Sequence, residues 1–324
     1  MIERLDGEPY VSFMKRVIAA VKNDDIDYME MGDALLGEDN VYSSDNSRKA
    51  FYFLDKICKK IDDKEVTLAR NRILCIADLH VPFQKDIGCF EKFRNAADTL
   101  VLDGDLIDFV QISKFRKVCR NTPMEDIVSL WKYVIELIEY INPKEVYAND
   151  GNHEKRFEAY LQKNVENDLI ELMPSSVLEL IFEDGFYHYD RKHHSKTWYE
   201  PINKIFKDKK IVYTHSWHNQ IGDTIFAHPS AFSSGTLSTC LKAVRWFNDN
   251  QYSFNQIILA HTHHRGEATI GKIDAIESGC CCETKDNIYN DGYLTNPQQE
   301  GFVYICQDKD GNTIREMTEK VRLN

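Results

Sequence analysis

The sequence has no run of about eighteen consecutive apolar residues, the length that a helix needs to cross a membrane. Its first residues, MIERLDGEPYVSF, carry charges where a secretory signal peptide has an apolar core. Basic residues are outnumbered, with 40 Lys and Arg against 52 Asp and Glu and a formal net charge of −12. A protein that wraps a nucleic acid backbone is disfavoured, because that mode of binding neutralises phosphates with Lys and Arg. We expect a soluble cytoplasmic protein.

The 324 residues suffice for one large domain and a small appendage. The hydrophobic fraction of 43% and the charged fraction of 28% are ordinary for a globular protein and exclude a mainly disordered chain. Nine cysteines are an odd number in a chain that shows no export signal. They are most simply read as reduced cytosolic thiols.

Residues 1–66 are predicted to form an all-helical, helix-turn-helix-like domain. Apolar residues recur at helical spacing in Val11, Met14, Val17, Ile18 and Val21, and again in Met29, Met31, Leu35 and Leu36. Gly37 can end the second helix, and the polar residues 43–46 can cap a third helix, SRKAFYFLDKICKK. This last helix carries Arg48, Lys49, Lys56, Lys59 and Lys60, as a DNA-reading or partner-binding helix would. The ten basic and fifteen acidic residues of the domain weaken the DNA interpretation and leave a helical cap or an oligomerisation element as the alternative.

Residues 67–324 alternate short apolar segments with longer amphipathic ones, which predicts an α/β sheet built from βαβ units. Three buried strands are predicted at RILCIAD, TLVLDGD and EVYANDGN, with a helix at MEDIVSLWKYVIELIEYI. Further strands are predicted at KIVYTH, TIFAH, QIILAH, AIESG and GFVYICQ, with hairpin turns at Gly222-Asp223, Gly271 and Gly311. The segment DRKHHSKTWYEPINK is expected to be a loop over the fold.

Residues that can bind a metal follow five of these strands, at the point where each strand ends. In open α/β sheets, ligands bind beyond the carboxyl ends of the strands. The five blocks are Asp78-Leu-His80, Gly104-Asp105-Leu-Ile-Asp108, Gly151-Asn152-His153-Glu154, Ala227-His228-Pro229 and Ala260-His261-Thr-His263-His264. One such block is uninformative, because D-x-H occurs by chance and a single histidine at a strand end is more often structural. Five blocks in order indicate a site.

The order of the five blocks resembles the calcineurin-like metallophosphoesterase superfamily, whose motifs run D-x-H, G-D-x-x-D, G-N-H-E/D, a single H and G-H-x-H. The resemblance covers roughly residues 70–280 and implies a metallophosphoesterase-type β-sandwich flanked by helices, preceded in this chain by the helical domain. The combination also resembles phosphoesterases encoded by large bacterial viruses. Ala260 departs from the pattern, which usually has Gly there, and we expect it to affect backbone packing rather than metal binding.

The resemblance implies two divalent metal ions that share one carboxylate. The first ion would be held by Asp78, His80, Asp105 and His263, and the second by Asp105, Asn152, His228 and His261. Carboxylate, imidazole and amide ligands suit manganese, our first expectation, and also iron, zinc or nickel. Two ions about 3.5–4 Å apart can clamp a phosphoryl group and generate the nucleophile, a metal-bound hydroxide.

The resemblance also places His153 over the phosphate, where it stabilises charge or protonates the leaving group. Asp108 would orient His153, and a histidine paired with a buried carboxylate would stay protonated at neutral pH. The alternative for Asp108 is an ordinary loop cap. Glu154 either supports the ligands or is simply an acidic residue in the first turn of a helix. Substrate contacts are assigned to Asn152, His264 and Arg156, although a solvated helix face is the commoner setting for an arginine like Arg156.

The histidine of the fourth block is ambiguous, because His215, His218 and His228 all lie in the same region. His228-Pro229 ends a strand and precedes a serine-rich helix start, as in the family, so His228 is our choice. His215 and His218 would then line the rim of the pocket with Trp217.

Three consecutive cysteines, Cys280, Cys281 and Cys282, follow the strand AIESG. They invite a thiolate metal site or a redox role. Adjacent residues on a strand alternate between faces, however, and do not share one metal as C-x-x-C pairs do. We therefore expect buried, inert thiols.

The sequence thus predicts a phosphoric ester hydrolase that depends on two metal ions. A phosphodiesterase, and within that class a nuclease, acting on nucleic acid or nucleotides is the first choice. The serine/threonine protein phosphatases of the superfamily follow this Asp with Arg-Gly, whereas Phe109 and Val110 follow Asp108 here. A phosphomonoesterase acting on a small molecule is the second choice, and a DNA- or partner-binding module with weak hydrolysis is the alternative from another class.

Overall fold

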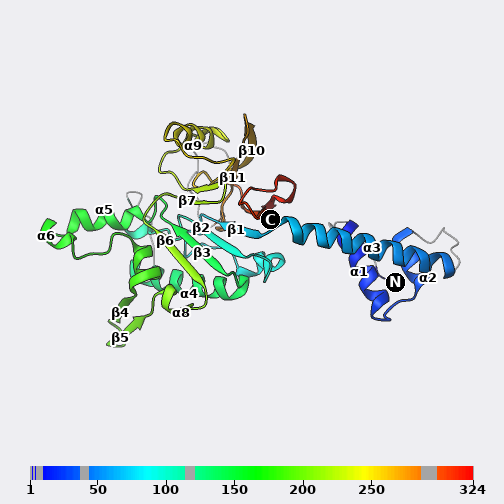
Figure 1. Ribbon diagram of the computed structural model, residues 1–324. Coiled ribbons are helices and arrows are strands. Elements are labelled where there is room, and N and C mark those ends of the chain that lie inside the picture. The colour runs from blue at the N-terminus through cyan, green and yellow to red at the C-terminus, as the bar shows by residue number, and fades with distance from the viewer. Residues whose placement is uncertain are drawn as a thin grey trace. The chain divides into compact units, whose positions relative to one another are not determined.

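The structure is a computed structural model that describes residues 2, 4, 10–36, 44–113, 121–285 and 298–323. Its contacts divide the chain into two units, Met1–Leu68 and Ala69–Asn324 (Figure 1). Each unit has a hydrophobic core of its own. The described residues include no helix with the length and apolar character needed to cross a membrane.

The described residues of the first unit form three helices, α1 (Tyr10–Lys22), α2 (Tyr28–Leu36) and α3 (Ser44–Leu68). Val17, Ile18, Met31 and Phe51 are buried between them. Asp27 caps α2, because its Oδ1 accepts hydrogen bonds from the backbone N–H groups of residues 29 and 30, each at 2.8 Å. The three predicted helices are therefore present, while the expected stop at residue 37 lies outside the described residues. Lys22 and Lys59 both pair with Asp55, which neutralises part of the positive charge of this unit.

The second unit is a sandwich of two sheets. The six-stranded sheet has the order β13-β12-β1-β2-β3-β6, with β13 (Glu319–Arg322), β12 (Gly301–Gln307), β1 (Asn71–Ile76), β2 (Thr99–Asp103), β3 (Glu145–Asn149) and β6 (Lys210–Thr214). The five-stranded sheet has the order β10-β11-β9-β8-β7, with β10 (Arg265–Ile270), β11 (Ile273–Ser278), β9 (Gln256–Leu259), β8 (Thr224–Ala227) and β7 (His218–Ile221). Strands β1, β2, β3 and β6 are parallel, as are β8, β9 and β11. The carboxyl ends of these parallel strands therefore lie along one edge of each sheet.

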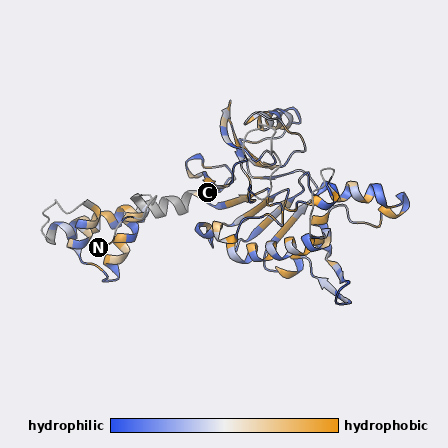
Figure 2. Cartoon of the chain, turned by 180° about the vertical axis from the view of Figure 1, so that it is seen from behind, coloured by the Kyte–Doolittle hydropathy of each residue, from blue (hydrophilic) through white to orange (hydrophobic). Residues whose placement is uncertain are grey.

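Apolar side chains from both sheets fill the space between them. Ile73 and Val101 from the first sheet pack with Phe226 and Ile258 from the second. Helix α4 (Pro123–Ile141) covers the outer face of the first sheet, and α9 (Ser238–Asp249) covers that of the second. Figure 2 shows many apolar residues along the strands and mostly polar ones over α5 (Lys155–Asn164), which buries no side chain. The result is a layered β-sandwich flanked by helices, as the sequence predicts.

The shorter elements connect these layers. They are η1 (Ile87–Phe93), η2 (Val110–Ile112), α6 (Asn167–Ile170), α7 (Val177–Glu179), η3 (Leu180–Asp184), β4 (Phe186–Asp190), β5 (Ser195–Tyr199), α8 (Ile202–Ile205) and η4 (Arg315–Met317). The expected loop at 190–204 is wrong, because β4 and β5 pair as an antiparallel hairpin there. Its cross-strand aromatic pair, Tyr187 and Trp198, has ring centroids 4.7 Å apart, and this contact stabilises a hairpin that is otherwise exposed. The hairpin turn at Gly222 is confirmed between β7 and β8, and that at Gly271 between β10 and β11.

Asp98 lies where three strands of the first sheet begin, and its ion pairs there should stabilise the fold. Its carboxylate accepts hydrogen bonds from Arg72 Nε at 2.7 Å and from Lys144 Nζ at 2.8 Å. Burial opposes ionisation, but Arg72 and Lys144 outweigh it and lower the pKa of Asp98 to about 2. We expect Asp98→Asn to lower the free energy of unfolding by about 1 kcal/mol at neutral pH, since Arg72 and Lys144 are largely exposed and screened.

The pH dependence of this effect follows from the sign of the shift. A carboxylate with a folded-state pKa below the unfolded value of about 3.9 stabilises the fold above that value and loses the effect as pH falls toward the folded-state pKa. Urea unfolding at several pH values should therefore show a difference between wild type and Asp98→Asn that is constant above about pH 5 and shrinks between about pH 4 and 2. Asp310→Asn, at an exposed turn, is the control. A difference that does not change with pH would contradict the assignment.

Candidate metal centre

Two groups of the predicted metal ligands converge at the carboxyl ends of the strands, beside a further group made of His80, Asp108 and His153. Asp78, His80 and His263 form one group, in which one ligand atom from each residue lies within 4.8 Å of the others. Asp105, His228 and His261 form the second group by the same measure. These residues follow β1, β2, β8 and β9, so both sheets of the sandwich contribute to the site.

Asp105 brings the two groups together. Its Oδ2 lies 3.3 Å from His228 Nε2 in the second group and 3.8 Å from His80 Nε2 in the first. Asp78 Oδ1, in turn, lies 3.1 Å from His263 Nε2 and 3.9 Å from His228 Nε2. The seven predicted metal ligands include all six of these residues, and the position of Asp105 suits a ligand shared by two ions.

Three buried polar atoms at this site make no hydrogen bond within the protein. They are Asn152 Oδ1, His228 Nε2 and His261 Nε2. A buried polar atom without a partner costs free energy, so such atoms are rare unless something binds them. All three belong to predicted ligands of one ion, and amide oxygen and imidazole nitrogen are donors that divalent metals accept. The residues present therefore fit a divalent metal.

The backbone at the site is held in unusual conformations. Five of the predicted metal ligands have positive φ angles: Asp78 (53°), His80 (48°), Asp105 (48°), His261 (75°) and His263 (53°). Such conformations each cost about 1–3 kcal/mol and persist only where the surrounding structure imposes them. Their coincidence with the ligand positions indicates that side-chain placement is maintained at the expense of backbone strain.

Two glycines permit the close packing of the ligand loops. A Cβ atom at Gly151 would lie 2.2 Å from Asp105 Oδ1, and one at Gly104 would lie 2.7 Å from the ring of His228. Neither position can carry a side chain while Asp105 and His228 keep their places. Ala260, where the family usually has Gly, is buried and has no positive φ angle, so its methyl group fits.

Glu154 is the residue whose importance the sequence left undecided. Its buried carboxylate accepts hydrogen bonds from the backbone N–H groups of Asp105 (3.0 Å), Leu106 (2.8 Å), Ile107 (3.3 Å) and Gly151 (2.8 Å). It therefore fastens the loop after β2 to the loop after β3 and fixes the backbone of Asp105. The signal in the sequence was the acidic residue of the G-N-H-E block, but only the fold shows that it faces inward.

His153 lies beside the metal ligands and is held from two sides. Its Nδ1 is 3.0 Å from the backbone oxygen of Asp108 and 3.4 Å from Asp108 Oδ1, while its Nε2 is 2.7 Å from Arg156 Nη2. A guanidinium group only donates hydrogen bonds, so Nε2 must accept, and Nδ1 carries the proton that it donates to Asp108. His153 is therefore neutral in this arrangement.

The expectation that His153 keeps its proton is thus wrong for this structure. Burial lowers the pKa of His153, and the nearby positive charges of His80 and Arg156 lower it further. Asp105 and Asp108 raise it, but the net shift is downward. Arg156 also departs from the solvated helix face that we considered more common. It is half-buried, and its Nη1 donates a hydrogen bond of 2.5 Å to the backbone oxygen of Asp108.

The remaining predicted histidines take different positions. His264 is buried, but its Nδ1 faces Glu277 Oε2 at 4.0 Å, and it is in none of the ligand groups found among the described residues. Of the three candidates for the fourth block, only His228 joins the group around Asp105. His215 Nδ1 lies 2.6 Å from Asp150 Oδ2, and His218 Nε2 lies 3.1 Å from the hydroxyl of Tyr252.

Residues 71–265 match the family model described as calcineurin-like phosphoesterase, which is more than half of the chain. The chain belongs to the calcineurin-like phosphoesterase family. Like other members, it is a metal-dependent phosphoester hydrolase. A search of curated proteins found no match.

Several solved structures are similar to this chain at low sequence identity. One is an archaeal phosphodiesterase, with 15% identity, coverage of 78% of this chain and 99% of that chain, and a TM-score of 0.33. Another is Vacuolar Protein Sorting 29 from Cryptosporidium parvum, with 12% identity, coverage of 79% and 99%, and a TM-score of 0.37. A metallophosphoesterase from Sphaerobacter thermophilus has 12% identity, coverage of 78% and 89%, and a TM-score of 0.36.

The electrostatics of this phosphoesterase centre suit cation binding. Burial opposes ionisation of Asp78, yet His263 and His228 outweigh it and hold the pKa of Asp78 well below its usual range. Burial likewise opposes protonation of His228, but Asp105 and Asp78 raise its pKa to about 10. Burial lowers the pKa of His261 to about 4, but without a metal, protons on histidines such as His228 balance the buried carboxylates. Metal binding releases such protons, because imidazole binds a metal only when neutral.

The positions of these residues in the phosphoesterase suit distinct tasks. A divalent metal bound there would act as a Lewis acid toward a phosphoryl group. Asp105 and Asp78 would hold the metal charge in place, with the imidazoles of His80, His228, His261 and His263 and the amide oxygen of Asn152 completing the set. Arg156 presents a guanidinium beside this centre, where it can donate hydrogen bonds to phosphate oxygens, while the unprotonated Nε2 of His153 can accept a proton there.

Proposed function

We propose that the protein is a phosphodiesterase that acts on nucleic acid or nucleotides. The observation that carries this proposal is a cavity of about 380 Å³ whose lining includes Trp217, Trp246, Lys155 and Lys242. Its size is in the range of small-molecule sites, and it combines flat aromatic surfaces with positive charge. Nucleotides need both, because bases stack on aromatic rings and phosphates attract lysine.

Several residues that line the cavity are adjacent in sequence to residues of the candidate metal centre. Lys155 comes directly after Glu154 and two residues after His153, while Pro229 and Ser230 of the lining follow His228 directly. Lys155 Nζ donates a hydrogen bond to Ser230 Oγ at 3.1 Å, which ties these two segments together. A phosphate at the centre would therefore have the cavity next to it for an attached nucleoside.

The two tryptophans are arranged so that one supports the other. Their ring centroids are 5.0 Å apart at an interplanar angle of 69°, and Trp217 also packs against Phe247 at 5.0 Å. Trp246 is 43% exposed, which leaves part of its ring available to a ligand. The supporting contacts limit its movement and so lower the entropic cost of binding a base.

We expect Trp246→Ala to raise KM for a dinucleotide roughly 5- to 30-fold, the effect of losing about 1–2 kcal/mol of base stacking. KM for a chromogenic diester without a base should change little, and kcat on both substrates should stay close to wild type. Trp198→Ala removes another exposed tryptophan, on the β4–β5 hairpin, and is the matched control. Equal changes on both substrates would show that the cavity is not a base site.

The choice between diester and monoester is tested with the wild-type protein. After chelation and addition of manganese, hydrolysis of a chromogenic phosphodiester is compared with that of the matching phosphomonoester. Preference for the diester supports the proposal, and a screen of single- and double-stranded nucleic acids follows. Preference for the monoester replaces it with the second candidate, a small-molecule phosphomonoesterase.

Recognition of a partner by the helical unit is a separate proposal. Tyr52 and Phe53 on α3 are 56% and 65% exposed, an unusual pair of large apolar side chains on a helix surface. Because Asp55 pairs with two of the nearby lysines, a protein partner suits this surface better than DNA. DNA contact through this unit stays a prediction, and it would be contradicted if the whole chain failed to bind duplex DNA at low salt.

A further inference from the structure

The three consecutive cysteines follow β11 and have no part in the phosphoesterase chemistry described above. All three side chains are fully buried. The sequence predicts such burial, and it also predicts that neighbouring cysteines face opposite ways. Cys281 does so: it belongs to the large core cluster on the outer side of the first sheet. The same alternation places Cys280 and Cys282 on one side, together.

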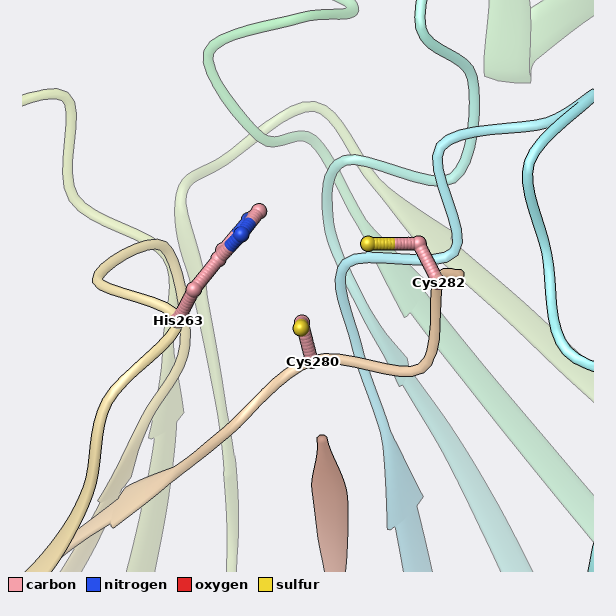
Figure 3. A group of neighbouring side chains, drawn as sticks. All are labelled: His263, Cys280 and Cys282. Carbon is pink, nitrogen blue, oxygen red and sulfur yellow. The ribbon is translucent and has the colours of Figure 1, made fainter. Parts of the chain in front are cut away.

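Cys280 and Cys282 meet His263 on that side. The sulfur atoms of both cysteines and a ring nitrogen of His263 lie within 4.8 Å of one another. Figure 3 shows the three side chains pointing toward a common space. The expected burial of the thiols is confirmed, and Cys280 and Cys282 lie together because residues two apart on an extended segment share a face.

The backbone holds this arrangement from both sides. Residue 280 bridges to Glu300, and residue 282 bridges to Gln84. Gly279 makes the turn after β11 with a φ angle of 83°, and a Cβ atom there would lie 2.7 Å from the backbone oxygen of Gln299. Because main-chain contacts fix the segment, the two sulfur atoms stay near each other without a bound ion.

We propose that His263, Cys280 and Cys282 form a metal site for a thiophilic divalent cation of the zinc class. Two thiolates and one imidazole, with a fourth position open, are a donor set that zinc accepts in tetrahedral geometry. Magnesium and manganese prefer oxygen donors and gain little from sulfur. This inference goes beyond the proposed function, because it concerns which cation the centre selects and not which ester it cleaves.

His263 connects the new site to the phosphoesterase centre. Its Nε2 lies 3.1 Å from Asp78 Oδ1 and 3.0 Å from His80 Nε2, so it belongs to the Asp78–His80–His263 group as well. A cation drawn toward the sulfur atoms engages the same histidine. The cysteines thus bias that part of the centre toward zinc, cobalt or iron over manganese.

Binding through sulfur requires that each thiol lose its proton to solvent, since the thiolate is the ligand. In the structure the Cys280 thiol donates a hydrogen bond to the backbone oxygen of Gln299 at 3.5 Å, a weak interaction that metal binding would replace. No electron transfer is involved. Each of the two sulfur–metal bonds formed replaces one S–H bond, and the imidazole of His263 also gives up a proton so that it binds the metal in its neutral form.

Cobalt(II) is the probe, because a thiolate bound to it gives a sulfur-to-cobalt charge-transfer absorption in the near ultraviolet that oxygen and nitrogen ligands do not give. The metal-free full-length protein is titrated with cobalt, and proton release is followed in parallel. We expect the absorption in wild type, its loss in Cys280→Ser/Cys282→Ser, and a zinc affinity of the double variant at least 10-fold weaker. Manganese affinity should stay within about 3-fold. Cys281→Ala is the matched control and should keep the absorption.

The wild-type titration decides the matter even if a variant fails to fold. Cobalt bound without the sulfur absorption would overturn the proposal, as would an absorption that survives in the double variant. Hydrolysis of the chromogenic diester with manganese, measured on the same sample, separates the two conclusions. Hydrolysis without the sulfur absorption removes only the thiolate site, whereas the absorption without any hydrolysis removes only the proposed function.

Discussion

Asp105→Asn should abolish both metal binding and hydrolysis, because Asp105 faces ligands of both groups at the centre. Loss of a residue that hydrogen-bonds to a metal ligand typically lowers metal affinity or activity by about 10- to 100-fold. Loss of a ligand shared by two ions should therefore lower each of them by more than about 100-fold. The substitution keeps the shape of the side chain and removes its charge. Bound manganese after dialysis and the rate of diester hydrolysis are the two measurements.

Asp103→Asn is the matched control for this experiment. Asp103 is also buried, only two residues away, and its Oδ1 accepts a hydrogen bond of 2.8 Å from Asn149. Burial raises its pKa to about 7, so the neutral amide resembles a state that the carboxyl already populates at neutral pH. Asp103→Asn should therefore retain metal and activity. If Asp105→Asn did so as well, the metal centre would lie elsewhere.

His153→Ala should lower kcat by about 10²–10⁴-fold, the usual contribution of a side chain that contacts the reacting group and its proton. His153 is not a predicted ligand, so manganese affinity should stay close to wild type, in contrast to Asp105→Asn. Arg156 would lose one of its two hydrogen-bonded anchors and hold the phosphate less well, which would add a rise in KM.

The control is His193→Ala, on the exposed β4–β5 hairpin, which should leave all parameters unchanged. Unchanged hydrolysis in His153→Ala would show that this histidine does not contact the substrate. A joint loss of metal and activity would instead make it a ligand. Measuring manganese affinity and kcat separately for His153→Ala distinguishes these outcomes.

The strand ends illustrate how far local sequence determines this protein. Buried parallel strands are recognised as short apolar runs, and the polar residue that follows each run must lie at the edge of the sheet. Asp78, Asp105 and His261 could therefore be located before the fold was known. Helix α4 was equally accessible, because its capping box at Thr122 and Glu125 and its apolar face are both local signals.

The tertiary structure alone decided other features. Glu154 is an acidic residue at the start of a helix by sequence, and it became the acceptor of four backbone N–H groups only because the loops after β2 and β3 meet. The sequence favoured His228 over His215 and His218, but only the fold shows that its Nε2 lies 3.3 Å from Asp105 Oδ2. The protonation of His153 depends on its hydrogen bond with Arg156, which lies three residues later in the chain. No sequence pattern specifies that the side chain of Arg156 points toward His153.

The sequence by itself determined the chemistry: which ligand types are present, at which strand ends, and in what order along the chain. It could do so because strand periodicity and strand termination are local properties. What only the tertiary structure decided is which of these groups touch. Cys280 and His263 lie on separate strand ends, and their approach depends on the pairing of β10 with β11 and on the turn at Gly279. Contacts of that kind arise from packing between distant segments, which no local pattern encodes.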